Sequence, residues 1–365
     1  MTAVVEVAGL HKRFGEVRAV DDVSFAVGAH EFFSLLGPSG CGKTTTLRCV
    51  AGLESADRGA IRIGDRIVFD RAGRVDLPPN QRAIGMVFQS YAVWPHMSVF
   101  DNIAYPLKVQ GRARAVIADR VARVLEILGM RGLERRMPGQ LSGGQQQRVA
   151  LGRALALEPA VLLLDEPLSN LDAKLREQMR AELKLLQKDT GLPILYVTHD
   201  QTEALAMSDR IAVMSEGRIH QLAGPSDIYR RPATQFVLDF IGTVNYVPCR
   251  LEDPTADPLR LILADGQACD LPRPSFVPAA GDVLLAVRPE DIAIGPDGRG
   301  LMAEVELGSF LGHANEYRVR LGDRVLRVVG DKQLNVAEGT TVGLTVRDGL
   351  LLERDALERP LARAS

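Results

Sequence analysis

The sequence of 365 residues has neither a surplus of one charge nor a long apolar run. Lys and Arg together number 44 against 46 Asp and Glu, which leaves a formal net charge of −2. This balance argues against a general nucleic-acid binder, because binding to a polyanion needs a basic face. Charged residues also interrupt every hydrophobic stretch before it reaches the roughly 18 apolar residues of a membrane helix. We therefore expect a globular chain without a membrane span and without a nucleic-acid partner.

Cysteine is scarce, and its spacing fits neither a disulfide framework nor a CxxC metal site. The four cysteines are Cys41, Cys49, Cys249 and Cys269, which favours a reducing, cytosolic compartment. Residues 1–10 lack the basic-then-apolar order of a secretion signal. With 46% hydrophobic and 25% charged residues, a chain of this length predicts two or three globular domains.

Up to about residue 241, apolar runs alternate with helical patterns, which indicates a mainly parallel α/β sheet. Three runs are almost wholly apolar and predict central strands that are buried on both faces, namely residues 32–36, 161–164 and 194–197. Helical periodicity predicts helices over residues 114–128 and 173–188.

After about residue 243 the pattern changes to short alternating runs separated by Asp-Gly turn signals. These runs predict strands at residues 317–321, 325–329 and 342–346. Such spacing is typical of a small, OB-like β-barrel. We therefore divide the chain into a first domain at 1–242, with a helical subdomain at about 90–160, and a second domain at 243–358.

Residues 37–44, Gly-Pro-Ser-Gly-Cys-Gly-Lys-Thr, match G-x-x-x-x-G-K-[ST] between a predicted strand and a helix. Glycines let the backbone N–H groups point at phosphate oxygens, and the helix that opens at Gly42 adds the positive end of its dipole. Lys43 supplies a positive charge, and the Thr44 hydroxyl can bind Mg²⁺. Only roughly 0.01 chance matches are expected in such a chain, so the pattern predicts a P-loop nucleotide site.

Two further polar groups follow the other apolar strands. Asp165 and Glu166 end the run at 161–166, where Asp165 can hold Mg²⁺ and Glu166 can polarise a water as general base. His199 ends the run at 194–198. Because the carboxyl ends of parallel strands meet at one sheet edge, we expect His199 to contact the γ-phosphate there.

The segment Leu141-Ser-Gly-Gly-Gln145 predicts a second phosphate-binding helix end. Ser142 and Gln145 form a capping box that opens a helix over residues 146–157. The two glycines of the first turn leave its N–H groups open to an anion. The chain therefore either binds two anions or uses each helix end for one side of a shared nucleotide.

At this point the sequence resembles the ATPase subunits of ABC transporters. The motifs at 37–44, 89, 141–145, 161–166, 169–172 and 199 stand in that family's order, and the resemblance covers about residues 4–241. It implies that two chains pair head to tail, with each ATP between one chain's P-loop and the partner chain's Ser142 segment. The cofactors it implies are ATP and Mg²⁺.

The resemblance also assigns individual residues. Lys43, Glu166 and His199 are implied to be catalytic, and Thr44, Gln89 and Asp165 to hold Mg²⁺. Phe14 is similar to the aromatic that stacks on adenine, and its alternative is an ordinary core Phe. Residues implied to bind ATP are Phe14, Gly37, Pro38, Ser39, Gly40, Cys41, Gly42, Lys43, Thr44, Thr45 and Gln89, with Ser142, Gly143, Gly144, Gln145 and Asp172 of the other chain.

An ATPase without a membrane span must pass its work to a partner. The segment 91–97, which contains the single Trp of the chain, follows Gln89. It fits either the core of the helical subdomain or a groove for a helix of a membrane subunit. The resemblance favours the groove and implies two transmembrane permease subunits that dock near Gln89–Met97.

The residues 146–150 and 287–291 resemble the importer branch with a C-terminal accessory domain, and 239–245 resembles its polyamine and ferric-iron members. This implies a peripheral protein at the cytoplasmic face of the inner membrane, served indirectly by a periplasmic solute-binding protein. Two alternatives stay open, a soluble ABC-type ATPase outside transport and a regulator in which the barrel senses a signal. A GTPase is disfavoured because no Asn-Lys-x-Asp motif is present.

Cys41 lies inside the P-loop at a helix N-terminus. The helix dipole and Lys43 predict a lowered thiol pKa and a reactive cysteine. The alternative is a small residue that merely fits the loop.

Overall fold

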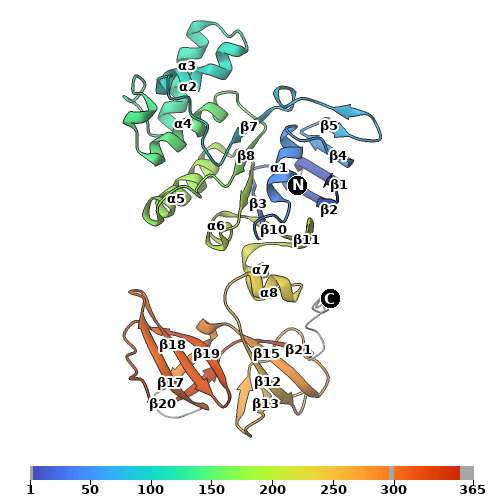
Figure 1. Ribbon diagram of the computed structural model, residues 1–365, viewed down its shortest axis with the longest axis vertical. Coiled ribbons are helices and arrows are strands. Elements are labelled where there is room, and N and C mark those ends of the chain that lie inside the picture. Colours follow the sequence, from blue (N-terminus) through green and yellow to red (C-terminus); the bar gives the residue numbers. More distant parts are fainter. Residues whose placement is uncertain (1–2, 296–299, 354–365) are drawn as a thin grey trace. The chain divides into compact units, whose positions relative to one another are not determined.

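The computed structural model describes residues 3–295 and 300–353. The chain divides into two compact units, residues 1–230 and 231–365, each with its own core (Figure 1). Among the described residues, no helix is both long and apolar enough to cross a membrane. All four cysteines are buried and free.

The centre of the first unit is a six-stranded sheet in the order β11-β10-β3-β9-β8-β7. Its members are β3 (Phe32–Leu36), β7 (Ile84–Val87), β8 (Val161–Asp165), β9 (Ile194–Thr198), β10 (Arg210–Ser215) and β11 (Arg218–Ala223). All neighbours are parallel except β10 and β11. Every residue of β3, β8 and β9 is buried, which confirms the three predicted central strands.

A second, antiparallel sheet has the order β2-β1-β4-β5-β6. It consists of β1 (Ala3–Phe14), β2 (Val17–Gly28), β4 (Arg58–Ile63), β5 (Arg66–Asp70) and β6 (Val75–Asp76). Helix α1 (Lys43–Ala51) lies between the sheets, because its residues Leu47 and Val50 share one core with side chains of both.

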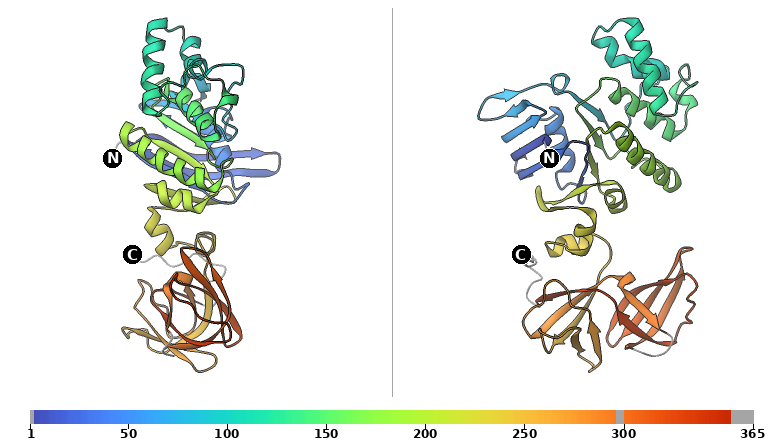
Figure 2. Two further views of the ribbon diagram at one scale, coloured as in Figure 1. Left: turned by 90° about the vertical axis from the view of Figure 1, so that its left-hand side faces the viewer. Right: turned by 180° about the vertical axis from the view of Figure 1, so that it is seen from behind.

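Five further helices of this unit pack around a separate core on the other side of the central sheet (Figure 2). They are α2 (Val99–Val109), α3 (Arg114–Ile127), α4 (Gly143–Leu155), α5 (Ala173–Thr190) and α6 (Gln201–Met207). Helix α7 (Pro225–Arg230) packs instead against α6, β10 and β11. Short 3-10 turns lie at Pro79–Gln81 and Pro138–Gln140. The predicted helices at 114–128 and 173–188 are therefore confirmed as α3 and α5.

The second unit contains helix α8 (Gln235–Phe240) and two antiparallel five-stranded sheets around one core. The first sheet contains β12 (Asn245–Leu251), β13 (Leu259–Leu263), β14 (Ala268–Leu271), β15 (Gly281–Val287) and β21 (Leu350–Glu353). The second contains β16 (Ile292–Gly295), β17 (Leu301–Phe310), β18 (Ala314–Leu321), β19 (Arg324–Asp331) and β20 (Thr341–Val346), and a 3-10 turn spans Pro289–Asp291. The three predicted strands fall within β18, β19 and β20, while residues 354–358 of the predicted domain lie outside the described residues.

A buried arginine fixes the end of helix α1. Arg82 is only 1% exposed, and its guanidinium donates to the carbonyl oxygens of Cys49, Val50 and Leu77 at 2.7, 3.1 and 2.7 Å. The Asp76 carboxylate accepts a fourth bond at 2.9 Å. Arg82 therefore adds donors to carbonyls of the last turn of α1, where the Cys49 oxygen also accepts the N–H of the C-cap residue Gly52 at 3.2 Å.

We expect Arg82→Met to lower the free energy of unfolding by about 2–4 kcal/mol, because buried carbonyls lose their donors. The exposed Arg71→Met is the matched control and should change stability by less than about 0.5 kcal/mol. Urea unfolding followed by circular dichroism measures both. Equal stability of the two variants would contradict this role of Arg82.

Candidate nucleotide site

The P-loop joins the end of β3 to the start of α1, as predicted. Two of its glycines have no room for a side chain. A Cβ on Gly37 would lie 2.2 Å from the Met214 carbonyl oxygen, and one on Gly42 would lie 2.0 Å from that of Ala19. Gly42 also has φ +104°, a conformation that L-residues rarely adopt. The absence of side chains at Gly37 and Gly42 thus lets the loop pass close to the backbone of β10 at Met214 and of β2 at Ala19.

Lys43 is buried and points back into the loop. Its ammonium donates to the carbonyl oxygens of Gly37 and Pro38, both at 2.9 Å. The tip of the loop, Ser39 and Gly40, is exposed. The positive charge therefore lies directly under an open backbone turn, as a phosphate site requires.

A hydrogen bond joins the P-loop helix to the next strand. The Thr44 hydroxyl donates to Oδ1 of Asp165 over 2.9 Å. Burial raises the pKa of the Asp165 carboxyl above its usual value, and the Thr44 bond partly opposes this. A hydroxyl and a carboxylate side by side are hard oxygen donors that fit Mg²⁺. No cluster of three or more His, Cys, Asp or Glu able to hold a metal occurs in the described part of the chain.

Glu166 and His199 lie together at the same sheet edge. The His199 Nδ1 is 3.0 Å from Oε2 of Glu166, and the imidazole is half exposed. Glu166 has φ +46°, which is rare for a residue with a side chain, and its N–H donates to the Val197 carbonyl oxygen. Such backbone strain occurs mostly at functional positions. The predicted meeting of Asp165 and His199 with the P-loop at Gly37, all at one sheet edge, is therefore what the structure has.

Gln89 lies two residues after β7, beside β8. Its carbonyl oxygen accepts a 2.8 Å bond from the Asn170 amide, which links this loop to the segment that follows Glu166. Thr45, in the first turn of α1, is half-buried. The hydrogen bond thus joins the Gln89 loop to the segment that follows Glu166.

The capping box at the Ser142 segment is confirmed. The Ser142 hydroxyl accepts the N–H of Gln145 at 3.3 Å, and Gln145 Oε1 accepts the N–H of Ser142 at 3.0 Å. Ser142 and Gly143 are exposed, whereas Gly144 is buried. A Cβ on Gly144 would lie 3.1 Å from Leu175, so this glycine also permits close packing of α4 on α5.

Asp172 caps α5 by accepting the Leu175 N–H at 3.0 Å. The preceding Leu171 lies against Gly143, so the structure brings Asp172 and the Ser142 segment together. Helices α1 and α4 belong to different parts of the first unit, α1 beside the sheets and α4 among the helices (Figure 1). The chain therefore presents its two phosphate-type helix ends separately.

Phe14 ends β1 and is 48% exposed, which excludes the alternative of a core Phe. The Lys12 ammonium lies 4.9 Å from its ring centroid. An exposed ring at the end of a hairpin is free to stack on a base.

The prediction of a lowered pKa for Cys41 is wrong. The side chain is 5% exposed, and burial raises the pKa of its thiol, although Lys43 acts in the opposite direction. A Cβ on Gly37 would lie 2.7 Å from the Cys41 sulfur, so the residue fills a tight space. Cys41 is therefore a small residue that fits the loop.

The aromatic segment after Gln89 is part core and part surface. Tyr91 is buried, while Trp94 is half-buried and packs on Tyr105 with ring centroids 4.4 Å apart. Arg153 of α4, which no sequence motif marks, also contacts this segment. Its guanidinium lies 4.4 Å from the Trp94 ring centroid and donates to the carbonyl oxygens of Tyr91 and Ala92 at 3.0 and 2.6 Å. Only the tertiary fold brings Arg153 there, so no local signal could have found it.

Tyr91 and Ala92 both have positive φ, +59° and +48°. The hydrogen bonds from Arg153 to these two carbonyl oxygens therefore stabilise a turn whose backbone conformation is unfavourable for residues with side chains.

Family models match both units. Residues 20–169 match the model described as ABC transporter, and residues 285–352 match the TOBE domain. Among solved structures, one titled as part of an ABC transporter complex from Clostridium perfringens has a TM-score of 0.57 at 26% identity and covers 62% of this chain and 91% of its own. A dimeric ATP-binding cassette bound to ADP and Pi has a TM-score of 0.52 at 30% identity, covering 60% and 98%.

Characterised relatives extend over most of the chain. The spermidine/putrescine import ATP-binding protein of Rubrobacter xylanophilus is 45% identical over 358 residues, 95% of this chain and 93% of its own. The Fe(3+) ions import ATP-binding protein of Agrobacterium fabrum is 45% identical over 338 residues, 92% and 93%. The trehalose/maltose import ATP-binding protein of Thermococcus litoralis is 51% identical over 295 residues, 80% and 79%. The chain therefore belongs to the ABC transporter ATP-binding subunits of the importer branch, ATPases with a C-terminal TOBE domain.

Proposed function

We propose that two copies of this chain bind ATP between them, each site combining the P-loop of one copy with the Ser142 segment of the other. The observation that carries this is the separation of two intact phosphate-binding helix ends in one chain. The end at Gly42 has Lys43 beneath it, and the end at Ser142 is exposed and has no basic side chain in its first turn. A relative solved as a dimer with ADP and Pi supports this arrangement.

Within each site, different residues bind the phosphates, bind Mg²⁺ and activate the attacking water. Lys43 and the P-loop N–H groups bind the β- and γ-phosphates, and Phe14 stacks on adenine. Thr44, Asp165 and Gln89 would hold Mg²⁺, which would neutralise phosphate charge when bound. Glu166 acts as general base for the attacking water, and His199 orients Glu166 while facing the γ-phosphate.

ATP works as a switch because it contacts both copies only when they are closed. Hydrolysis removes that bridge, and the dimer reopens. The strained turn at Tyr91 and Ala92, held by Arg153, connects the site to the partner surface at 89–97. We propose that two permease subunits dock there and receive the motion, with Trp94 and Tyr105 as the aromatic contact surface.

The proposed location is the cytoplasmic face of the cell membrane, bound to the permease.

For the cargo, a polyamine or ferric iron is favoured, since relatives named for these cargoes match over more than nine tenths of this chain. A periplasmic solute-binding protein would deliver it. A search of the neighbouring genes for a solute-binding protein, followed by isothermal titration of that protein with spermidine, Fe³⁺ and maltose, tests the assignment. Binding of maltose alone would contradict it.

We expect Glu166→Gln to accumulate as an ATP-bound dimer. Without the general base, bound ATP is hydrolysed only slowly, so it continues to bridge the two copies. Size-exclusion chromatography with light scattering, with ATP and Mg²⁺, measures the mass. Glu304→Gln, an exposed residue of β17, is the matched control and should remain monomeric as ATP turns over. A Glu166→Gln chain that stays monomeric at high ATP and protein concentrations would contradict the shared site.

We expect His199→Ala to lower kcat by about 10²–10³-fold with little change in ATP affinity, because Glu166 loses the imidazole that orients it. Phosphate release gives kcat, and titration with a fluorescent ATP analogue gives Kd. The exposed His313→Ala is the control and should keep both values. A kcat within twofold of the parent would rule out this role for His199.

A further inference from the structure

The charge of the chain is balanced overall but not locally. Residues 105–136 contain eight Lys or Arg against three Asp or Glu, within a chain of net charge −2. This stretch covers the C-terminal part of α2, all of α3 and the loop after α3. The helical part of the first unit therefore carries a concentrated positive charge.

Four of these eight basic side chains are neutralised by an acid, and four are not. Lys108 pairs with Asp101 at 2.7 Å, and Arg123 pairs with Asp119 at 2.7 Å. Arg120 and Arg131 also have acidic partners. The other four are exposed and form no ion pair with any residue that the structure describes. We call this set the basic face: Arg112, Arg114, Arg135 and Arg136.

Apolar side chains are exposed in the same place. Val109, the last residue of α2, is 70% exposed, and Val116, in the first turn of α3, is 51% exposed. They flank Arg112 and Arg114 in the α2–α3 turn. From residue 102 to 118 the sequence contains no acid. Exposed aliphatic and basic residues together are typical of surfaces that bind at a lipid interface.

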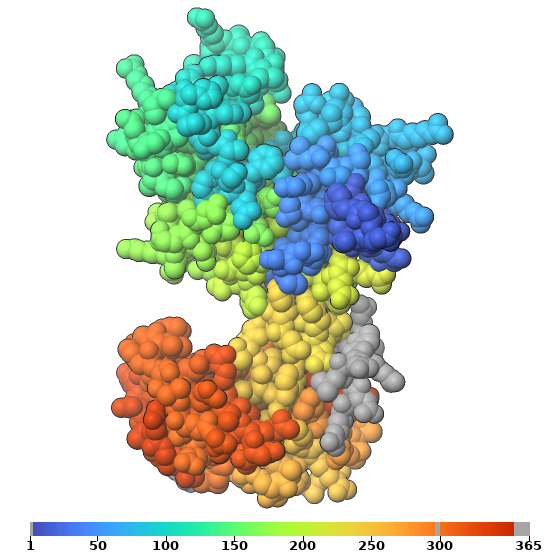
Figure 3. All heavy atoms as spheres, in the orientation of Figure 1, coloured from blue at the N-terminus to red at the C-terminus, as the bar shows by residue number. Residues whose placement is uncertain are grey.

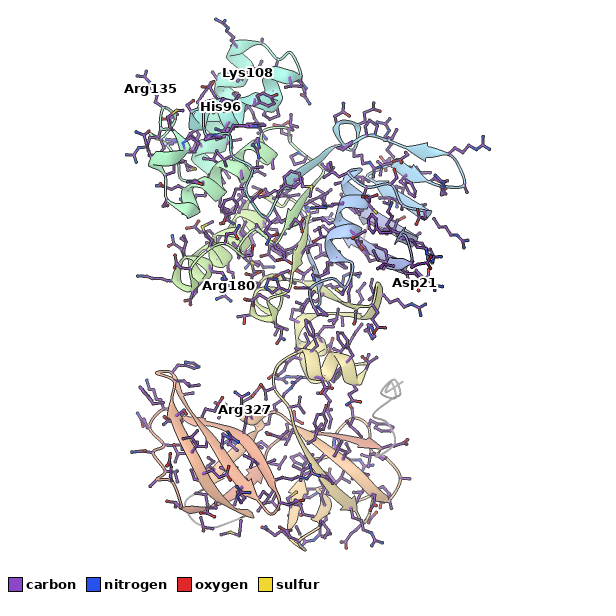
Figure 4. All side chains as sticks on the ribbon, viewed as in Figure 1. Asp21, His96, Lys108, Arg135, Arg180 and Arg327 are labelled. Atoms are coloured by element: carbon purple, nitrogen blue, oxygen red, sulfur yellow. The ribbon has the colours of Figure 1, made fainter. Side chains whose placement is uncertain are left out.

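The Arg135–Arg136 part of the basic face adjoins the segment at which we propose that the permease docks, and Arg112 and Arg114 follow the other end of α2. The Val99 N–H donates to the Arg136 carbonyl oxygen at 2.9 Å, so the loop with Arg135 and Arg136 lies at the start of α2. Asn102 of α2 donates to the carbonyl oxygens of Trp94 and Met97 at 3.1 and 3.0 Å. Figure 4 shows His96, Lys108 and Arg135 at the same end of the first unit, and Figure 3 shows side chains projecting from it.

We propose that the basic face binds the anionic lipid headgroups of the membrane in which the permease lies. The proposal rests on the proposed function, because docking at 89–97 turns this end of the unit toward the bilayer. Unpaired arginines are attracted to the negative surface potential, and each contributes about fivefold to binding. Val109 and Val116 add apolar contact at the headgroup level. The lipid surface would then hold the subunit near the permease while the dimer opens.

The test uses the full chain alone with sedimenting vesicles of phosphatidylcholine or of phosphatidylcholine with 30% phosphatidylglycerol. The variant replaces Arg112, Arg114, Arg135 and Arg136 by Gln. The matched control replaces four exposed, unpaired arginines elsewhere, Arg71, Arg74, Arg318 and Arg324, and so removes the same charge. ATP hydrolysis of each chain in solution reports that the nucleotide site is intact.

We expect the parent and the control to bind the anionic vesicles, and the basic-face variant to bind at least about tenfold more weakly. The binding should fall in 0.5 M salt and be absent with neutral vesicles. Equal loss in the control, or no binding by the parent, would overturn the proposal. The parent could fail to bind vesicles while the basic-face variant assembles with the permease in detergent more weakly than the parent does. That result would assign the face to a protein partner instead. If neither the parent nor any variant assembled with the permease in detergent, that result would contradict the proposed function itself.

Discussion

The parallel register of β3, β9 and β8 is the constraint on which the site depends. Leu36 lies opposite Thr198, and Val197 lies opposite Asp165, so three chain segments leave the sheet at one edge. The P-loop, the Asp165–Glu166 pair and His199 follow these strands directly. Because the strands are wholly buried, a shift of register would have to move a packed core on both faces. The sheet therefore fixes distances between groups that lie far apart in the sequence.

The same chemistry, backbone N–H groups at a helix start, occurs a second time on α4. At this second helix start, packing rather than a basic side chain determines the geometry. Gly144 lets α4 approach Leu175 of α5 closely, while Ser142 and Gly143 stay exposed. Asp172 caps the neighbouring helix beside it. One chain thus carries two complementary faces, and a head-to-tail pair is the simplest way to bring them together. The strained turn held by Arg153 gives the site a physical connection to the segment at which the permease is proposed to dock.

Sequence patterns predicted what is local. The strands around residues 32–36, 161–164 and 194–197, the helices α3 and α5, and the capping box at Ser142 follow from periodicity and capping rules, and they lie within a few residues of their predicted positions. The Cys41 prediction failed because the dipole and Lys43 are local, whereas the burial that dominates the thiol pKa comes from distant packing. Besides the nearby Leu77 carbonyl, Arg82 binds carbonyls of α1 at least 32 residues away, and Arg153 binds carbonyls up to 62 residues away. Only the fold brings these groups together. The roles assigned by family resemblance concern a bound nucleotide and stay predictions.

Complementation between two inactive chains measures the central claim, a site shared by two copies, most directly. Lys43→Ala removes the P-loop charge, and Ser142→Arg blocks the opposite helix end, so each variant alone should lack ATPase activity. In a mixed dimer, the shared-site account leaves one site with an intact P-loop and an intact Ser142 segment. We predict that mixing the two purified variants restores ATP hydrolysis, at up to about half the activity per dimer of the parent if the sites act independently. If each chain carried a complete site of its own, the mixture would stay inactive, and that result would contradict the account.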